Sequence, residues 1–252
     1  MNDLTVILGA TGALGTALVD AFAKRGDRII AVARSRSGVS QLASEYPLSP
    51  SPSGGGQGGG IVSGETADLT SRQAVDDLWE RIDRIGVPRW VVNATGGFRG
   101  GKLVDSTPDD FPMMIDLNLG SAWWSCRAAA RRMQTATSPS PSGGGQGGGG
   151  CIVNVASRSA LVVEPGAAAY AVAKAGVIKL TEVLAAELKA SGVRVNAVVP
   201  AIIDTPANRQ SMPEKLIQKA VAPAEVAAVI AYLCSDAAAT ITGAAVPVYG
   251  RY

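Results

Sequence analysis

The sequence predicts an α/β fold in which one doubly wound, parallel sheet of seven strands carries helices on both faces. Short apolar runs alternate with longer amphipathic stretches along the whole chain of 252 residues. The apolar runs are β-branched or continuously apolar, as expected for strands covered on both sides. Parallel neighbours need crossover connections, and the amphipathic stretches supply these as helices. We therefore expect a single domain over residues 1–252.

Each predicted strand except the last is followed by one predicted helix. In chain order the strands are LTVILGA, RIIAVAR, IVSGETAD, RWVVNATG, CIVNVAS, RVNAVVPA and AAVPVYG. The predicted helices are Gly15–Arg25, Val39–Tyr46, Arg72–Ile85, Leu119–Met133, Ala169–Ala190 and Pro223–Cys234. This alternation is the repeating unit of a parallel sheet.

A repeated segment, SPSPSGGGQGGG, interrupts this order at residues 49–60 and again at 138–149. Its Pro/Ser half favours extended backbone, and its glycine half behaves as a flexible coil. No lysine follows the glycines, so the segment does not match a phosphate-binding loop. Each copy lies between a predicted helix and the strand after it. We interpret both as inserted loops at the amino-terminal edge of the sheet, away from any site at the carboxyl edge.

Composition excludes several functions. The chain has no histidine, which excludes serine–histidine hydrolysis, histidine general-base catalysis and histidine-ligated metal sites. A net charge of +2 is too small to indicate binding to nucleic acid or to an anionic membrane. The three cysteines are far apart and form no CxxC motif, which favours a reducing compartment. No signal peptide or membrane-spanning run is evident, so we expect a cytoplasmic protein without a bound metal.

A glycine-rich turn follows the first predicted strand. In VILGATGALG, Gly9, Gly12 and Gly15 lead directly into the first helix. Glycine allows a tight turn and close backbone approach, and the unpaired N–H groups of the helix suit a pyrophosphate. At the first strand of a parallel sheet this pattern predicts a Rossmann-type domain that binds a nicotinamide dinucleotide.

The end of the second strand discriminates between the two nicotinamide dinucleotides. It reads AVARSRSG, with Arg34, Ser35 and Arg36 and no carboxylate. An acidic residue there would hold the free ribose hydroxyls of NAD(H), whereas a guanidinium binds the 2′-phosphate of NADP(H). The charge pattern favours NADP(H) over NAD(H), although two nearby arginines are also compatible with an ordinary solvated surface.

A tyrosine and a lysine lie one helical turn apart in AAYAVAKAG. Tyr170 and Lys174 share a helix face at positions i and i+4. A phenol titrates near pH ~10, too high for efficient proton transfer at neutral pH. We expect the neighbouring ammonium to lower the Tyr170 pKa. This pair would supply proton chemistry in a chain without histidine.

Taken in order, the motifs resemble those of the short-chain dehydrogenase/reductase family over almost the whole chain. The glycine turn is followed by Asn118 in DLNLGSAW, Ser157 in IVNVASRS and the YxxxK pair. The resemblance implies four catalytic residues, Asn118, Ser157, Tyr170 and Lys174. In that scheme Ser157 holds the substrate oxygen, Tyr170 is the general acid/base, and Lys174 bonds the nicotinamide ribose. Asn118 anchors a water that links Lys174 to solvent, or serves only backbone groups, as buried asparagines often do.

The same resemblance implies a set of residues that contact the cofactor. They are Gly9, Thr11, Gly12, Leu14, Gly15, Arg34, Ser35, Asp68, Leu69, Asn93, Ala94, Thr95, Tyr170, Lys174, Pro200, Ile203 and Thr205. Two positions depart from the family pattern, with Ala13 where many relatives have glycine and Ala201 in place of the usual glycine after Pro200.

The family resemblance implies an NADP(H)-dependent oxidoreductase that transfers hydride between the nicotinamide and a carbonyl or alcohol substrate. The segments DTPANRQSMPE and ATGGFRGGKL are also similar to dihydropteridine reductases, which makes a quinonoid dihydropterin an alternative substrate. A non-catalytic, NADP-binding regulatory protein is the alternative of another class. In the family, the helices corresponding to 119–133 and 169–190 pair across a two-fold axis, so we expect a homodimer or homotetramer.

Overall fold

The computed structural model describes residues 3–46, 62–136 and 149–251. The repeated segments at 49–60 and 138–149 lie outside these ranges, apart from Gly149, so their expected loop conformation stays a prediction. Each predicted strand is present, shortened by one to four residues. The strands are β1 (Leu4–Leu8), β2 (Arg28–Ala33), β3 (Val62–Thr66), β4 (Trp90–Asn93), β5 (Cys151–Val155), β6 (Arg194–Pro200) and β7 (Ala245–Val248).

The strands form one parallel sheet in the order β3-β2-β1-β4-β5-β6-β7, which confirms the predicted fold class. The chain winds outward from β1 in one direction and then from β4 in the other. β1 and β4 are neighbours, and Leu8 pairs with Asn93 at their carboxyl ends. A crevice forms at such a reversal, because the connections on either side of it leave in opposite directions.

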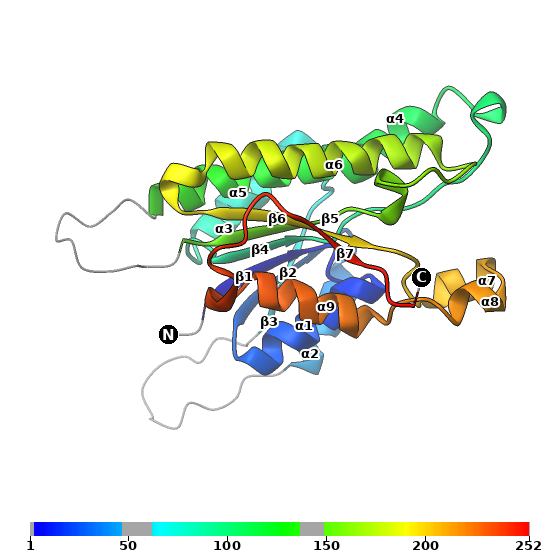
Figure 1. Cartoon of the computed structure of the whole chain (residues 1–252). Coiled ribbons are helices and arrows are strands. Elements are labelled where there is room, and N and C mark those ends of the chain that lie inside the picture. Colours follow the sequence, from blue (N-terminus) through cyan, green and yellow to red (C-terminus); the bar gives the residue numbers. More distant parts are fainter. Residues whose placement is uncertain (1–2, 47–61, 137–148, 252) are drawn as a thin grey trace.

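Helices cover both faces of the sheet (Figure 1). The α-helices of the described part are α1 (Ala13–Arg25), α2 (Arg36–Glu45), α3 (Arg72–Asp83), α4 (Asp110–Met114), α5 (Ser121–Ala136), α6 (Ala168–Glu187), α7 (Pro206–Ser211), α8 (Glu214–Ile217) and α9 (Pro223–Leu233). α1, α2 and α9 cover one face, where Phe22 and Ile230 are fully buried. α3, α5 and α6 cover the other, with Trp79 fully buried.

Two helical segments differ from the expectation. The helix predicted to begin at Leu119 starts nine residues earlier, as α4 and then a π-helical turn, η2 (Ile115–Gly120), before α5. α7 and α8 were not predicted, because they have only 6 and 4 residues and no extended apolar period. The α7 start has recognisable signals: Thr205 accepts a hydrogen bond from the Asn208 N–H, and Pro206 follows it.

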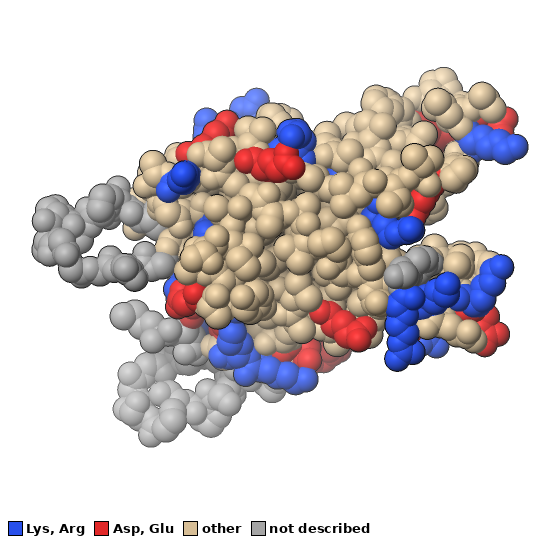
Figure 2. All heavy atoms as spheres, in the orientation of Figure 1, with Lys and Arg blue, Asp and Glu red and all other residues tan. Residues whose placement is uncertain are grey.

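Helices α4 on one side and α7–α8 on the other project beyond the carboxyl ends of the strands (Figure 1). Figure 2 shows the surface notched between these two projections. On the face drawn there, Lys and Arg are interspersed with Asp and Glu rather than gathered into one patch. The fold therefore concentrates its concave surface at the carboxyl edge of the sheet.

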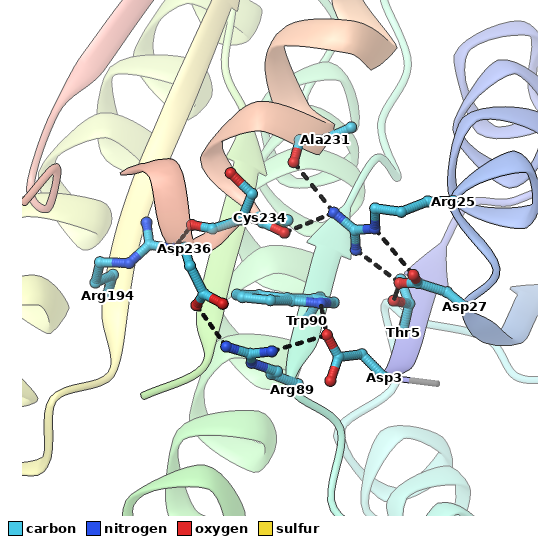
Figure 3. Close-up of polar contacts among 11 residues, drawn as sticks. Asp3, Thr5, Arg25, Asp27, Arg89, Trp90, Arg194, Ala231, Cys234 and Asp236 are labelled. Atoms are coloured by element: carbon cyan, nitrogen blue, oxygen red, sulfur yellow. Dashed lines mark hydrogen bonds and ion pairs between the residues drawn. The ribbon is translucent and has the colours of Figure 1, made fainter. Parts of the chain in front are cut away.

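The opposite edge of the sheet is closed by a network of charged groups (Figure 3). Arg25 bonds both carboxylate oxygens of Asp27, at 2.9 and 2.6 Å, and also donates to the Cys234 carbonyl at 2.6 Å. Asp27 is 3% exposed and accepts a further hydrogen bond from Thr5. The Arg25 guanidinium lies 4.4 Å from the ring centre of Phe22. One side chain therefore ties α1 and β1 to the end of α9.

Replacing Arg25 with alanine should destabilise the fold by about 3 kcal/mol, because it leaves the buried Asp27 carboxylate without its cation. Lys24→Ala is the matched control, since Lys24 makes an exposed i,i+4 pair with Asp20 whose loss should change the stability far less. Urea unfolding followed by circular dichroism measures both. Equal midpoints for the two variants would contradict the structural role of Arg25.

Candidate functional site

The turn between β1 and α1 brings backbone into unusually close contact. Gly9 has a positive φ of 86°, and its N–H donates to the Val32 carbonyl at 2.9 Å. A Cβ on Gly15 would lie 2.1 Å from the Gly9 carbonyl oxygen, so any side chain there would force the turn open. The first turn of α1 consequently packs directly on the loop and presents its amino end to the crevice.

A hollow at the carboxyl ends of β1, β2 and β4 contains many of the residues expected to contact the cofactor. Its lining comprises Gly9, Thr11, Gly12, Ala33, Arg34, Ala67, Asp68, Leu69, Thr70, Ala94, Thr95, Gly96 and Leu117. Hydrogen bonds from the Thr70 hydroxyl and N–H hold the pKa of Asp68 below its usual range, with a smaller effect from the Arg34 charge. Arg34 and Asp68 therefore line the same hollow, where a guanidinium and an ionised carboxylate lie near each other.

A second cavity, of about 620 Å³, adjoins the first and shares Ala94, Thr95 and Gly96 with it. Leu14, Pro200, Ile203 and Thr205 line it on the side of α1 and β6. Thr95 lines both cavities, and its hydroxyl is buried and has no hydrogen-bond partner among the described residues. A buried hydroxyl without a partner is costly unless a ligand satisfies it. The shared lining, the glycine turn and this hydroxyl fit a dinucleotide that spans both cavities.

The expected catalytic residues gather in the second cavity from two elements. Ser157 follows the end of β5, and Tyr170 and Lys174 lie on the first turns of α6. All three line the cavity. The Lys174 ammonium lies 5.8 Å from the centre of the Tyr170 ring, and Ser157 is close enough for hydrogen bonding to affect the Tyr170 pKa. The structure thus brings together three residues that are up to 17 positions apart in the sequence (174 − 157).

Lys174 is buried, at 4% exposure, and its ammonium donates a hydrogen bond to the Val155 carbonyl at 2.8 Å. Burial disfavours the charged form and lowers the Lys174 pKa to about 8. At neutral pH the side chain is therefore still protonated but holds its proton much less tightly than a surface lysine does.

The expectation that Lys174 lowers the Tyr170 pKa is wrong for this structure. Burial raises the pKa of the phenol above its usual value, a hydrogen-bonding interaction with Ser157 opposes the rise, and the charge of Glu164 adds to it. Lys174 is not among the groups that shift the Tyr170 pKa, and its ammonium donates to the Val155 carbonyl. Tyr170 is accordingly a protonated phenol at neutral pH.

Asn118 lies in the π-helical turn η2, beside Gly96 rather than on the cavity wall. Its amide donates to the carbonyls of Gly97 and Met114, both at 3.0 Å, and its oxygen accepts the Gly97 N–H at 3.2 Å. A Cβ on Gly96 would lie 2.7 Å from the Asn118 oxygen and 3.1 Å from the Lys174 nitrogen. Asn118 therefore holds the β4 loop next to Lys174, and its expected role with a bridging water stays a prediction.

Three of the expected cofactor contacts line neither cavity. Gly15 is packed beneath the turn, and Ser35 caps α2 by accepting the Gly38 N–H at 3.3 Å. The Asn93 amide is buried and donates to Asn154 at 2.6 Å and to the Cys126 sulfur. Gly15 and Asn93 therefore support the site from beneath its lining, whereas Ser35 is exposed at the start of α2.

Sequence reasoning did not single out several residues of the second cavity, which are Gly96, Gly97, Phe98, Val155, Ala156, Arg158, Ser159, Glu164, Ile202, Ala207, Asn208, Met212 and Leu216. The Phe98 ring meets the Tyr170 ring edge-on, with centres 5.1 Å apart. Phe98 lies in ATGGFRGGKL, one of the two segments whose sequences are similar to dihydropteridine reductases. Arg158, Ser159 and Glu164 follow Ser157 closely in the sequence, but no periodic pattern marks them.

The described part of the chain has neither a metal site nor a membrane-spanning helix. No cluster of three or more cysteine or carboxylate side chains there is arranged to hold a metal ion. No helix within residues 3–46, 62–136 and 149–251 has both the length and the apolarity to cross a membrane.

Comparison with known proteins agrees with this geometry. A family model described as enoyl-(acyl carrier protein) reductase matches residues 9–250. D-threitol dehydrogenase of Mycolicibacterium smegmatis is 32% identical, over 100% of this chain and 93% of its own length. The 3-oxoacyl-(acyl-carrier-protein) reductase FabG of Pseudomonas aeruginosa is 30% identical, over 99% and 96%.

Solved structures agree as well. The crystal structure of an oxidoreductase of the short-chain dehydrogenase/reductase family from Burkholderia thailandensis superposes with a TM-score of 0.82 at 29% identity, covering 99% of this chain and 92% of that one. The family model spans nearly the whole chain and includes every residue described above at the crevice. The chain therefore belongs to the short-chain dehydrogenase/reductase family, and it is an oxidoreductase.

Proposed function

We propose that this chain is an NADP(H)-dependent oxidoreductase that interconverts a carbonyl compound and the corresponding alcohol, with Tyr170 as the general acid/base. The observation that carries the proposal is the meeting of Ser157, Tyr170 and Lys174 in a cavity that adjoins the dinucleotide hollow. A regulatory protein that only bound the dinucleotide would not need these three groups together in the second cavity.

The nicotinamide cofactor, when bound, supplies or accepts the hydride. In the direction of reduction, Tyr170 gives its phenolic proton to the substrate oxygen, and Ser157 hydrogen-bonds the same oxygen. The raised Tyr170 pKa keeps that proton in place at neutral pH. Lys174 would hydrogen-bond the nicotinamide ribose, and Asn118 fixes the loop next to Lys174.

The rest of the second cavity supports a substrate with an apolar body. Its apolar surface comes from Phe98, Ile202, Met212 and Leu216. Met212 directly follows α7, and Leu216 lies on α8. The relatives named above act on a sugar alcohol and on an acyl-carrier thioester, so the panel to assay includes polyols, 3-oxoacyl thioesters, ketones, quinones and dihydropterins. Cofactor oxidation on adding each compound also separates an enzyme from a regulatory protein.

Tyr170→Phe should reduce carbonyl reduction by roughly 100-fold to 10,000-fold while NADPH still binds, because it removes the transferred proton and keeps the ring. The rate of NADPH oxidation measures the first effect, and quenching of NADPH fluorescence measures the second. Phe98→Leu is a useful comparison, since it removes the ring packed against Tyr170 but no exchangeable proton. Unchanged turnover in Tyr170→Phe would overturn the mechanism.

The preference for NADP(H) is proposed from the charge at the end of β2. Arg34 lines the first hollow, whereas Arg36 lines a different one with Glu65 and Arg81, between α2 and β3. A 2′-phosphate on the adenine-side ribose would therefore meet Arg34, which makes a planar, bidentate contact with phosphate.

Arg34→Asp should shift the ratio of kcat/KM values from NADPH towards NADH by at least about tenfold, because a carboxylate repels the 2′-phosphate and accepts ribose hydroxyls. Arg36→Asp makes the same change of charge two residues away and should move the ratio much less. If the two variants behaved alike, Arg34 would not be the residue that reads the phosphate.

The proposal extends to a homodimer or homotetramer through α5 and α6. Trp123 on α5 is 50% exposed, and Val172 and Val183 on α6 are 55% and 47% exposed. Large apolar side chains on neighbouring helices that lie outside the two main cores are typical of a surface covered by a second copy.

Trp123→Glu should lower the mass measured by light scattering. In a contact related by a two-fold axis, the new carboxylate would lie opposite the same carboxylate of the second copy, and the two charges would repel each other. Tyr232→Glu on α9 is the control, since Tyr232 is also about half exposed, at 49%, but lies on the opposite face of the sheet. A wild-type chain that is monomeric at micromolar concentration would exclude the proposed assembly.

A further inference from the structure

One carboxylate lies on the wall of the second cavity, and the mechanism above gives it no role. It belongs to Glu164, in the loop between β5 and α6, and no other described residue that lines this cavity has a carboxylate. Most of the surrounding wall is apolar and includes Phe98, Met212 and Leu216. Covering a charged group with an apolar ligand is costly, so a substrate that fills the cavity must offer Glu164 a hydrogen-bond donor or leave it in contact with water.

Two short contacts connect Glu164 to the serine that holds the reacting oxygen in the proposed function. One Glu164 oxygen accepts the Ser159 hydroxyl at 2.6 Å, and the Ser159 hydroxyl oxygen lies 3.3 Å from that of Ser157. The loop that carries Glu164 is also tied to the segment after β4, because the Gly101 N–H donates to the Gly166 carbonyl at 2.8 Å. The carboxylate is therefore held within two hydrogen-bond lengths of the Ser157 hydroxyl.

The Glu164 carboxylate has capacity for a further donor. Its two oxygens offer about four acceptor sites. The Ser159 hydroxyl occupies one of them, and the Arg158 guanidinium, at 3.0 Å, occupies another on the second oxygen. The Glu164 side chain is 39% exposed and lines the cavity, so a ligand there can reach the remaining lone pairs.

The pairing with Arg158 determines which kind of donor fits. The carboxylate repels an anionic group of a ligand, whereas the guanidinium beside it repels an ammonium group. A neutral hydroxyl meets neither repulsion, and it can donate to the carboxylate without a charge of its own. The charges of the pair therefore favour an alcohol hydroxyl over an acid or an amine.

The short separation of Ser157 and Glu164 places that hydroxyl close to the reacting carbon. Two oxygens on adjacent carbons of a substrate lie about one hydrogen-bond length apart, as the hydroxyls of Ser157 and Ser159 do. When Ser157 holds the first oxygen, the second can reach Glu164 by running alongside Ser159. A hydroxyl next to the carbonyl group therefore matches the spacing of the two protein groups.

We propose that Glu164 determines specificity by accepting a hydrogen bond from a hydroxyl on the carbon next to the reacting carbonyl, so that the substrate is an α-hydroxy ketone. Hydride addition at the carbonyl carbon, with oxidation of NADPH to NADP⁺, and transfer of the Tyr170 proton to the carbonyl oxygen give a vicinal diol. The inference rests on the proposed function, because it takes Ser157 as the group that holds the reacting oxygen.

Three ketones with one apolar body test the role of the hydroxyl: α-hydroxyacetophenone, α-methoxyacetophenone and acetophenone. The methyl ether keeps the electron-withdrawing oxygen but has no O–H to donate, so it separates hydrogen bonding from the reactivity of the carbonyl. We expect the wild-type kcat/KM with NADPH to be higher for the hydroxy ketone than for its methyl ether by roughly tenfold to 100-fold, the range for a hydrogen bond to a charged acceptor.

Two variants of Glu164 remove the acceptor to different degrees. Glu164→Ala should bring the ratio of hydroxy ketone to methyl ether close to one. Glu164→Gln keeps the length of the side chain and a neutral acceptor, so it should retain part of the preference even if the alanine variant folds poorly. Met212→Leu alters the apolar wall of the same cavity and should change the constants for the three ketones together. Glu80→Gln, at an exposed position on α3, should leave them unchanged.

A binding measurement supplements the kinetics, because it needs no turnover. In the presence of NADP⁺, which cannot reduce a ketone, saturation-transfer NMR measures the affinity of the protein for each of the three compounds. We expect the hydroxy ketone to bind more tightly than its methyl ether to the wild type, and the difference to disappear in Glu164→Ala.

The outcomes separate this inference from the proposed function. Reduction of ketones with the same preference in the wild type and both Glu164 variants, or with no preference in the wild type, would overturn the inference and leave the proposed function intact. Binding of the hydroxy ketone that depends on Glu164, in a protein that reduces no ketone, would support the hydroxyl site and contradict the proposed function. Neither reduction nor binding that depends on Glu164 would overturn both.

Discussion

The close packing of Gly9 and Gly15 is the constraint on which the architecture of the crevice depends. A Cβ on Gly9 would lie 2.9 Å from the backbone of Ala94, and one on Gly15 would lie even nearer to the Gly9 carbonyl. Without side chains at these positions, the loops after β1 and β4 touch at the point where the strand order reverses. Three other features of the site depend on that contact: the shared wall of the two cavities, the burial of the Thr95 hydroxyl and the approach of the β4 loop to α6.

The two edges of the sheet satisfy their polar groups in opposite ways. At the amino-terminal edge Arg25 pairs with the Asp27 carboxylate and the Cys234 carbonyl, and Arg89 pairs with the carboxylates of Asp3 and Asp236. At the carboxyl edge, by contrast, the Thr95 hydroxyl has no hydrogen-bond partner within the described residues, and the Lys174 ammonium donates to the Val155 carbonyl. The paired charges of the amino-terminal edge therefore contribute to stability, whereas polar groups at the carboxyl edge are available to a ligand.

Much of this arrangement was predictable from sequence because buried parallel strands are continuous apolar runs, and the residues after them meet at one edge. The strands followed from those rules, whereas the meeting of Ser157 with Tyr170 was implied by the resemblance to the short-chain dehydrogenase/reductase family. The raised pKa of Tyr170 could not be predicted from these rules, because its first cause is the burial of the phenol. Helical spacing places Lys174 nearby, but it does not show that the Lys174 ammonium donates to the Val155 carbonyl. α7 and α8 were too short to leave a period, and the Ser159–Glu164 contact depends on the path of an irregular loop.

The buried amine of Lys174 also links folding to proton binding. Its pKa of about 8 in the fold lies below the ordinary 10.5, so the unfolded chain binds this proton more tightly. Below pH 8 the folded state bears the full cost of burying the charge, and above 10.5 both states are neutral and the cost is gone. Over that interval this group should raise the free energy of unfolding by about 3 kcal/mol. At neutral pH the site is therefore a source of instability, and an anionic ligand that favours the ammonium would stabilise the whole chain as it binds.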